Sequence, residues 1–175
     1  MNYQPLPILV NKGHQISDFQ MINQAGKPVT TDNWKNKIVV VDFFFTHCPT
    51  ICPKMTKHLK MVQQSFVNDS NFLINSFSVD PDRDSTVRLA AYASQFNIRG
   101  NWDLLTGNKK EIYRLARKSF LIVATDGDGG PNDFIHSEKL ILIDREKRIR
   151  GYYNGTNENE VKQMIKDISR LRKEK

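Results

Sequence analysis

The stretch that decides the fold is KIVVVDFFFTHCPTICP, residues 37–53. Its first half, Lys37 to Phe45, is β-branched and aromatic, and Asp42 is the one break in a nearly continuous apolar run. Such a run predicts a strand buried on both faces, in the middle of a sheet covered by helices. The second half places Cys48 and Cys52 directly after that strand, where a helix begins. We therefore expect both cysteines at the carboxyl end of the sheet, where α/β proteins place their ligands.

Strand and helix patterns alternate on both sides of this stretch. Helices are predicted over residues 53–67, 86–96, 109–118 and 158–171, and strands over residues 16–22, 71–79, 102–105, 120–124, 139–143 and 148–153. The last two strands form a hairpin, and residues 125–133 (TDGDGGPND) are an exposed loop. This order predicts an α/β fold with a mixed central sheet flanked by helices, closed by a C-terminal β-hairpin and helix. A strand that runs directly into two cysteines at a helix start makes the fold thioredoxin-like.

The composition fits one folded domain. The chain has 175 residues, of which 39% are hydrophobic and 10% aromatic, and this excludes a disordered chain. We expect an irregular lead-in over residues 1–15 and a single domain over residues 16–175. No run approaches the roughly 20 apolar residues that a membrane-spanning helix needs, and no signal peptide is visible. Removal of a native anchor would leave the same pattern.

The net charge is +7, from 26 Lys and Arg against 19 Asp and Glu. Such a balance is compatible with nucleic acid, anionic lipid or an acidic protein as the partner. The basic residues gather on two predicted helices, and the simplest interpretation is a pair of solvated helix faces. Proteins that bind single-stranded nucleic acid interleave aromatic with basic residues, and the basic residues here have no such pattern. We therefore do not expect nucleic acid as a partner.

The chain has two cysteines, which excludes a disulfide scaffold and a four-cysteine zinc site. On a helix, residues four apart share a face, and the positive helix N-terminus favours thiolates. Three interpretations of Cys48 and Cys52 stay open: packing, a redox dithiol, or a soft-metal pair. The usual oxidoreductase spacing has two residues between the cysteines, whereas three stand here. Two thiolates suit Cu(I), and an added imidazole extends the site to Cu(II).

The strand KIVVVDFFF running into THCPTICP resembles the Sco/SenC copper chaperones, which serve cytochrome c oxidase assembly. The likeness continues through Ser78–Asp84 (SVDPDRD) and returns at Ile135–Ser137, just before Lys139–Asp144. The order of motifs matches from about Ile16 to Leu171. Thr50 departs from the family, since an acidic residue is frequent there, and the family's membrane anchor is absent from this sequence.

The resemblance implies a thioredoxin-like fold that binds one copper ion, Cu(I) or Cu(II), through Cys48, Cys52 and His136. It further implies delivery of copper to the binuclear copper centre of a cytochrome c oxidase subunit, or reduction of that subunit's cysteines. A copper donor protein is then a second partner. The implied location is the periplasm or the extracytoplasmic face of the inner membrane.

The remaining candidate residues are weaker. His47 is next to Cys48 but points away from it if strand geometry continues, so it is a candidate for a supporting contact. His58 lies more than one helical turn beyond Cys52 and is expected to be exposed. Asp80 ends a predicted strand at the same sheet edge, and we expect it to cap the next helix rather than to orient a ligand.

The sequence favours an assembly factor over a turnover enzyme. The main alternative is a thiol–disulfide oxidoreductase or redox sensor that uses the Cys48–Cys52 dithiol. Thioredoxin-type reductases place a cis-proline opposite their cysteines, whereas here that place is taken by Ile135–Ser137, with Pro131 the nearest proline. A peroxidase, with Thr46 near one reactive cysteine, is disfavoured by the paired cysteines.

Overall fold

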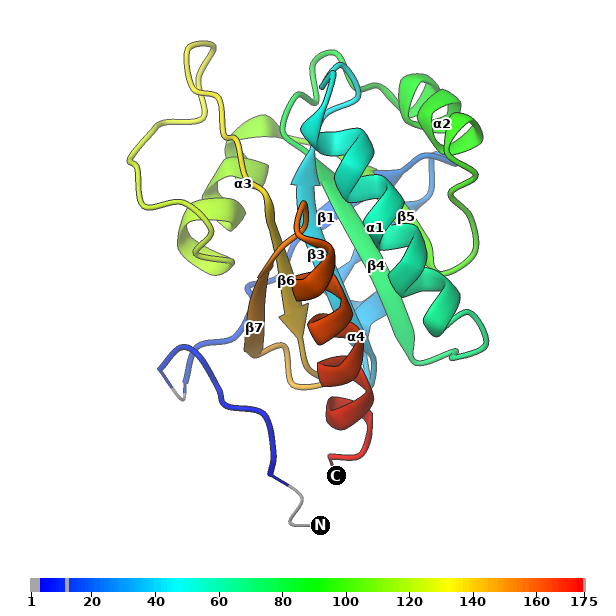
Figure 1. The fold of residues 1–175 in the computed structure, drawn as a ribbon. Coiled ribbons are helices and arrows are strands. Elements are labelled where there is room, and N and C mark those ends of the chain that lie inside the picture. The colour runs from blue at the N-terminus through cyan, green and yellow to red at the C-terminus, as the bar shows by residue number, and fades with distance from the viewer. Residues whose placement is uncertain (1–3, 12, 175) are drawn as a thin grey trace.

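The computed structural model describes residues 4–11 and 13–174. In this part of the chain, one mixed sheet has the strand order β2-β1-β5-β4-β3-β6-β7 (Figure 1). Its strands are β1 (Gln20–Asn23), β2 (Pro28–Thr30), β3 (Ile38–Phe44), β4 (Phe72–Ser78), β5 (Trp102–Thr106), β6 (Lys139–Ile143) and β7 (Ile149–Asn154). The thioredoxin-like α/β fold is confirmed, and so are the C-terminal hairpin and the helix that follows it.

Helices cover both faces of the sheet. They are α1 (Ile51–Ser65), α2 (Thr86–Gln95), α3 (Lys109–Arg114) and α4 (Glu158–Arg172), with short turns η1 (Thr31–Trp34) and η2 (Leu115–Ser119). One core lies between the sheet and α1, α2 and α4, and a second lies between the sheet and α3 with η2. Figure 1 shows α1 and α4 side by side across the sheet.

Strand β3 is the centre of the molecule. It pairs in parallel with β4 and antiparallel with β6, and all seven of its residues are buried, as the apolar run predicts. Successive side chains alternate between the faces, so Val40 and Phe44 enter the first core while Val41 and Phe43 enter the second. The position and direction of β3 fix where the cysteines leave the sheet.

Two strand predictions are wrong, the first in its bounds and the second entirely. The first strand begins at Gln20 rather than Ile16, although Ile16 is buried. The short β2 and η1 that follow it were not predicted. Residues 120–124 form no strand, because Phe120 N–H bonds back to the Leu115 carbonyl at 2.7 Å and Leu121 takes a left-handed conformation (φ 56°). Phe120 and Ile122 are buried without entering the sheet, whereas Leu121 is exposed.

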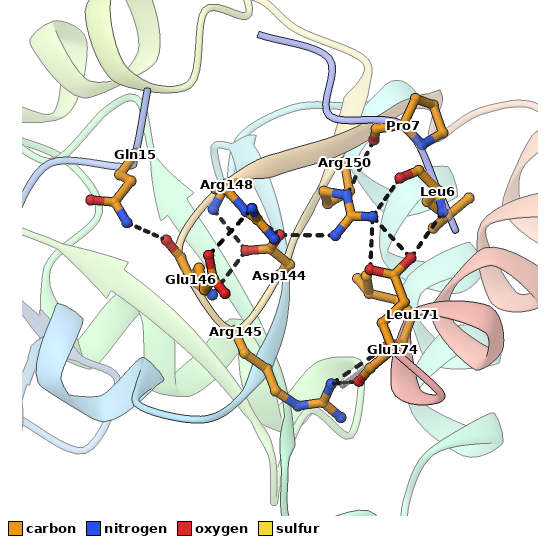
Figure 2. A network of polar contacts seen from close by, with 10 residues as sticks. All are labelled: Leu6, Pro7, Gln15, Asp144, Arg145, Glu146, Arg148, Arg150, Leu171 and Glu174. Atoms are coloured by element: carbon orange, nitrogen blue, oxygen red, sulfur yellow. Dashed lines mark hydrogen bonds and ion pairs between the residues drawn. The ribbon is translucent and has the colours of Figure 1, made fainter. Parts of the chain in front are cut away.

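The start of the described chain is tied to its end. The buried Arg150 guanidinium on β7 donates to the Leu6 and Pro7 carbonyls and pairs with both Asp144 and Glu174 (Figure 2). Leu6 N–H also donates to Glu174, at 2.9 Å.

Among the residues described, no helix is long and apolar enough to cross a bilayer.

Candidate metal centre

The cysteine turn leaves the sheet where β3 and β4 end together. Phe44 stands opposite Ser78 in the parallel register, and Val79 N–H donates to the Phe44 carbonyl at 2.8 Å. The chain then turns sharply, with Cys48 N–H 3.3 Å from the Phe45 carbonyl oxygen. The pair therefore lies at the carboxyl edge of the sheet, as predicted.

Helix α1 begins at Ile51, two residues before the predicted start. Cys48 precedes the helix and Cys52 lies in its first turn, so the two do not share a regular helix face. They meet through a cap instead, because the Cys52 N–H donates to Cys48 Sγ at 3.3 Å. Thr50 at the N-cap makes no side-chain cap bond, and the sulfur supplies the acceptor that helix starts need.

The two thiols differ in acidity. Burial acts to raise the pKa of Cys48, but hydrogen bonds from the Cys52 thiol and from the N–H groups of Cys52, Thr50 and Ile51 outweigh it and lower that pKa. Burial raises the pKa of Cys52, which is 5% exposed, and the neighbouring charges of Cys48 and Asp42 raise it further. Cys48 is therefore the thiolate that forms first and meets solvent.

The cysteines open onto a cavity of about 280 Å³, and His136 reaches it from a different part of the chain. The wall comprises Phe43, Phe45, Cys48, Ile51, Cys52, Val79, Ile135, His136, Ser137 and Glu138. The exposed His136 ring packs against aromatic rings, with centroid distances of 4.7 Å to Phe134 and 6.0 Å to Phe45. The cavity is the place that the three predicted ligands share.

The structure brings the cysteines into contact but does not complete a three-residue cluster. Within residues 4–11 and 13–174, no three His, Cys, Asp or Glu side chains gather closely enough to hold a metal ion. His136 therefore lines the same cavity as Cys48 and Cys52 without joining their contact. Its role as a third ligand stays a prediction.

Asp42 is a buried carboxyl that the sequence motifs did not assign to the site. It is 2% exposed and accepts a hydrogen bond from the Ser76 hydroxyl, which in turn accepts one from Trp102 Nε1 at 3.0 Å. Burial raises the pKa of Asp42 to about 7. The sequence already indicated that Asp42 is unusual, because it is a single acidic residue inside an apolar strand.

The segment that carries His136 is fixed by an ion pair. Arg117 on η2 makes a two-pronged contact with Asp133, at 2.5 and 2.7 Å, and its Nε donates to the Thr125 carbonyl. Gly129 N–H adds a bond to Asp133 at 2.8 Å. The loop predicted over residues 125–133 is confirmed as a loop, and this ion pair stabilises it.

Three weaker candidates do not line the cavity. His47 is exposed. The prediction that His58 is exposed is wrong, because its ring is buried and its Nδ1 lies 2.7 Å from the Gly155 carbonyl. Asp80 is not the helix cap: Ser85 caps α2, and the Asp80 carboxylate instead lies 3.8 Å from Arg83.

Comparison with known proteins identifies the family. The sequence profile described as SCO1/SenC matches residues 10–173, nearly the whole chain. The chain belongs to the SCO1/SenC family. This agrees with the cavity, because the family resemblance in the sequence rests on the segments that carry Cys48, Cys52 and His136.

Solved structures of the family have the same fold. A SCO1/SenC family lipoprotein from Bacillus anthracis matches with TM-score 0.81 and 31% identity, over 95% of this chain and 100% of that one. BsSco, described as a member of the Sco family of cytochrome c oxidase assembly proteins, matches with TM-score 0.81 and 30% identity, over 98% and 100%. Bradyrhizobium japonicum ScoI with copper bound matches with TM-score 0.72 and 26% identity, over 91% and 99%.

Proposed function

We propose that the protein is a copper metallochaperone whose cargo is one copper ion held by Cys48, Cys52 and His136. The observation that carries the proposal is that two thiols at a helix start and one imidazole open onto a single cavity. Sulfur and imidazole are ligands that copper prefers, two thiolates being sufficient for Cu(I) and nitrogen adding affinity for Cu(II). The copper-bound Bradyrhizobium japonicum structure supports this cargo.

Each ligand has a separate part in the proposal. The Cys48 thiolate, lowered in pKa and partly exposed, makes the first contact with incoming copper. Cys52 lies deeper with a raised pKa, so its proton leaves when the metal binds. His136 adds a nitrogen when Cu(II) is the cargo. The apolar walls formed by Phe43, Ile51 and other residues surround the buried Cys52, while Cys48 stays partly exposed for copper to enter.

The receiving partner in this proposal is the subunit of cytochrome c oxidase that holds a copper centre. BsSco, a member of a family of cytochrome c oxidase assembly proteins, supports this partner. The lipoprotein relative from Bacillus anthracis supports an extracytoplasmic location, where a copper donor protein loads the site.

A thiol–disulfide oxidoreductase or redox sensor is the second candidate function, because Cys48 Sγ accepts hydrogen bonds from the backbone and the thiol of Cys52. Ile135, His136 and Ser137 line the same cavity as the pair. An imidazole at this position serves a metal better than it serves disulfide exchange, and this favours the copper assignment.

Anaerobic copper titration of the reduced protein, with elemental analysis, tests the proposal. We expect about one copper per chain, since two thiolates and one imidazole form one ligand set. Absence of binding in the fully reduced protein would reject the chaperone role. Reduction of a partner's disulfide by the same sample would then favour the oxidoreductase.

A further inference from the structure

Asp84 is a buried carboxylate beside the cysteine turn, and neither the family resemblance nor the ligand set assigns it a role. It is 0% exposed and lies just before α2, next to the Ser85 cap. Burying a carboxylate is costly unless hydrogen bonds satisfy its oxygens. The groups that satisfy this one therefore indicate its role.

Asp84 accepts three hydrogen bonds from two residues. Thr46 donates twice, through its hydroxyl to Oδ1 at 2.5 Å and through its backbone N–H to Oδ2 at 3.2 Å. Ser78 donates its hydroxyl to Oδ2 at 2.7 Å. All three donors are uncharged, so the contact is directional and not an ion pair.

These bonds join three elements at the edge of the sheet that carries the cysteines. Thr46 follows β3, Ser78 ends β4, and Asp84 leads into α2. The loop is fixed in turn, because Asp84 N–H donates to the Asp80 carbonyl at 2.8 Å and Asp80 N–H donates to the Ser78 hydroxyl at 3.1 Å. These two bonds fix the loop that carries Asp84, so its carboxylate contacts the cysteine turn from a fixed position.

Thr46 stands two residues before Cys48, within the turn that the Cys48–Phe45 backbone bond closes. A displaced Thr46 displaces that turn, and Cys48 Sγ with it. The sulfur accepts the Cys52 N–H, so a shift also changes the contact between the two cysteines.

We propose that Asp84 is a positioning residue for the thiols: through Thr46 it fixes the turn that sets Cys48 against Cys52. The expected effect of Asp84 on copper binding rests on the proposed function, whereas its expected effect on the dithiol does not. A carboxylate suits the task because both of its oxygens accept, whereas an amide replaces one acceptor with a donor.

The test compares four variants. Thr46→Val keeps the shape and removes the hydroxyl, and Thr46→Ser keeps the hydroxyl. Asp84→Asn removes one acceptor. Asp144→Asn is the matched control, since Asp144 is also a buried carboxylate that fixes a turn (Figure 2). Asp144 follows β6, whereas His136 precedes it.

Three measurements are made on each variant: Cu(I) affinity by competition, the equilibrium of the Cys48–Cys52 dithiol with dithiothreitol, and thermal unfolding. We expect Asp84→Asn and Thr46→Val to weaken Cu(I) binding about 10- to 100-fold. We expect both to shift the dithiol equilibrium as well, whereas Thr46→Ser stays near the wild type. Asp144→Asn lowers the unfolding temperature without moving either site measurement.

Wild-type affinity and an unshifted dithiol equilibrium in Thr46→Val would overturn the proposal, as would equal shifts in Asp144→Asn. Thr46→Val, which leaves the buried carboxylate in place, decides the question if Asp84→Asn does not fold. If the wild-type protein binds no copper, the proposed function fails, and the dithiol equilibrium still decides the role of Asp84.

Discussion

The cysteine turn leaves a strand whose seven residues are all buried, whereas His136 lies in the segment 120–138, which runs from η2 to β6 without helix or strand. The turn is fixed on three sides, by the β3–β4 register, by the start of α1 and by Asp84. The histidine segment depends on the Arg117–Asp133 contact and on aromatic packing. The cysteine half of the cavity follows a core strand directly, whereas the histidine half reaches the core through Ile135, next to the exposed His136.

This difference has a chemical consequence. Cys48 Sγ already accepts hydrogen bonds from the backbone and the thiol of Cys52, so the two cysteines are neighbours before copper binds. The imidazole shares the cavity but packs on Phe134 and Phe45, so the His136 ring must change its position to join the cysteines in a ligand set. We expect changes to the cysteine half to act on all copper binding and on the core, and changes to the histidine half to act selectively.

The largest expected effect is at the cysteines themselves. Cys48→Ser and Cys52→Ser should each abolish tight copper binding, because one thiolate cannot replace a pair. Titration with elemental analysis should fall from about one copper per chain to a background level. Full affinity in either variant would contradict a shared site, and circular dichroism confirms that the variants fold.

The next effect tests whether the cysteine half is part of the core. Burial raises the pKa of Asp42 from its ordinary value to about 7, so the folded protein holds this proton more tightly than the unfolded chain does. The contribution of Asp42 to the free energy of unfolding is therefore greatest below about pH 4, and it declines as the pH rises to about 7. Asp42→Asn should remove this decline, which amounts to at most about 4 kcal/mol.

Urea unfolding of both proteins between pH 4 and 8 measures this difference. The variant should gain on the wild type as the pH rises, and the gap should stop growing above about pH 7. Parallel curves would mean that Asp42 does not titrate in the folded state as its burial indicates.

The cysteine half was predictable from sequence because its determinants are local. The apolar run predicts β3, and the two cysteines that follow it are predicted within a few residues of the observed helix start. The contact itself was not predictable in detail, because the expected shared helix face is replaced by a sulfur that caps the helix. Asp84 was hidden for a related reason: its partners Thr46 and Ser78 are 38 and 6 residues away.

The histidine half was harder to predict. Residues 120–124 have the pattern of a strand, but Leu121 turns the chain out of the sheet after η2. Burial of His58 depends on the Gly155 carbonyl, 97 residues away, which no local pattern indicates. Placing His136 near the cysteines came from the family motif, and its aromatic neighbours became visible only in three dimensions.

A selective effect is expected at His136. His136→Ala should leave Cu(I) affinity nearly unchanged, because two thiolates can hold Cu(I), and weaken Cu(II) binding at least about tenfold, or about 1.4 kcal/mol. The sulfur-to-copper charge-transfer band of the Cu(II) form should fade. His47→Ala, at an exposed neighbour of Cys48, is the control and should keep the band. An unchanged band in His136→Ala would assign that ring to packing.

The smallest effect concerns the ion pair that fixes the histidine segment. The hydrogen bond from Arg117 lowers the pKa of Asp133 to about 2. A carboxyl with a lowered folded pKa stabilises the fold fully above its ordinary pKa of 3.8, and this contribution is lost as the pH falls from there towards 2. After allowance for screening by solvent, Asp133→Asn should remove about 1 kcal/mol of stability at pH 7 and flatten the acid limb of the unfolding curve.

The matched control for this ion pair is Asp128→Asn, on the exposed part of the same loop. It leaves the contact between Arg117 and Asp133 intact, so its unfolding curve should retain the acid limb. Because Cys48 and Cys52 lie on the other half of the cavity, Cu(I) affinity should be equal in both variants. A loss of Cu(I) affinity in Asp133→Asn alone would show that the two halves are coupled, since the loop would then set the geometry of thiols that it does not contact.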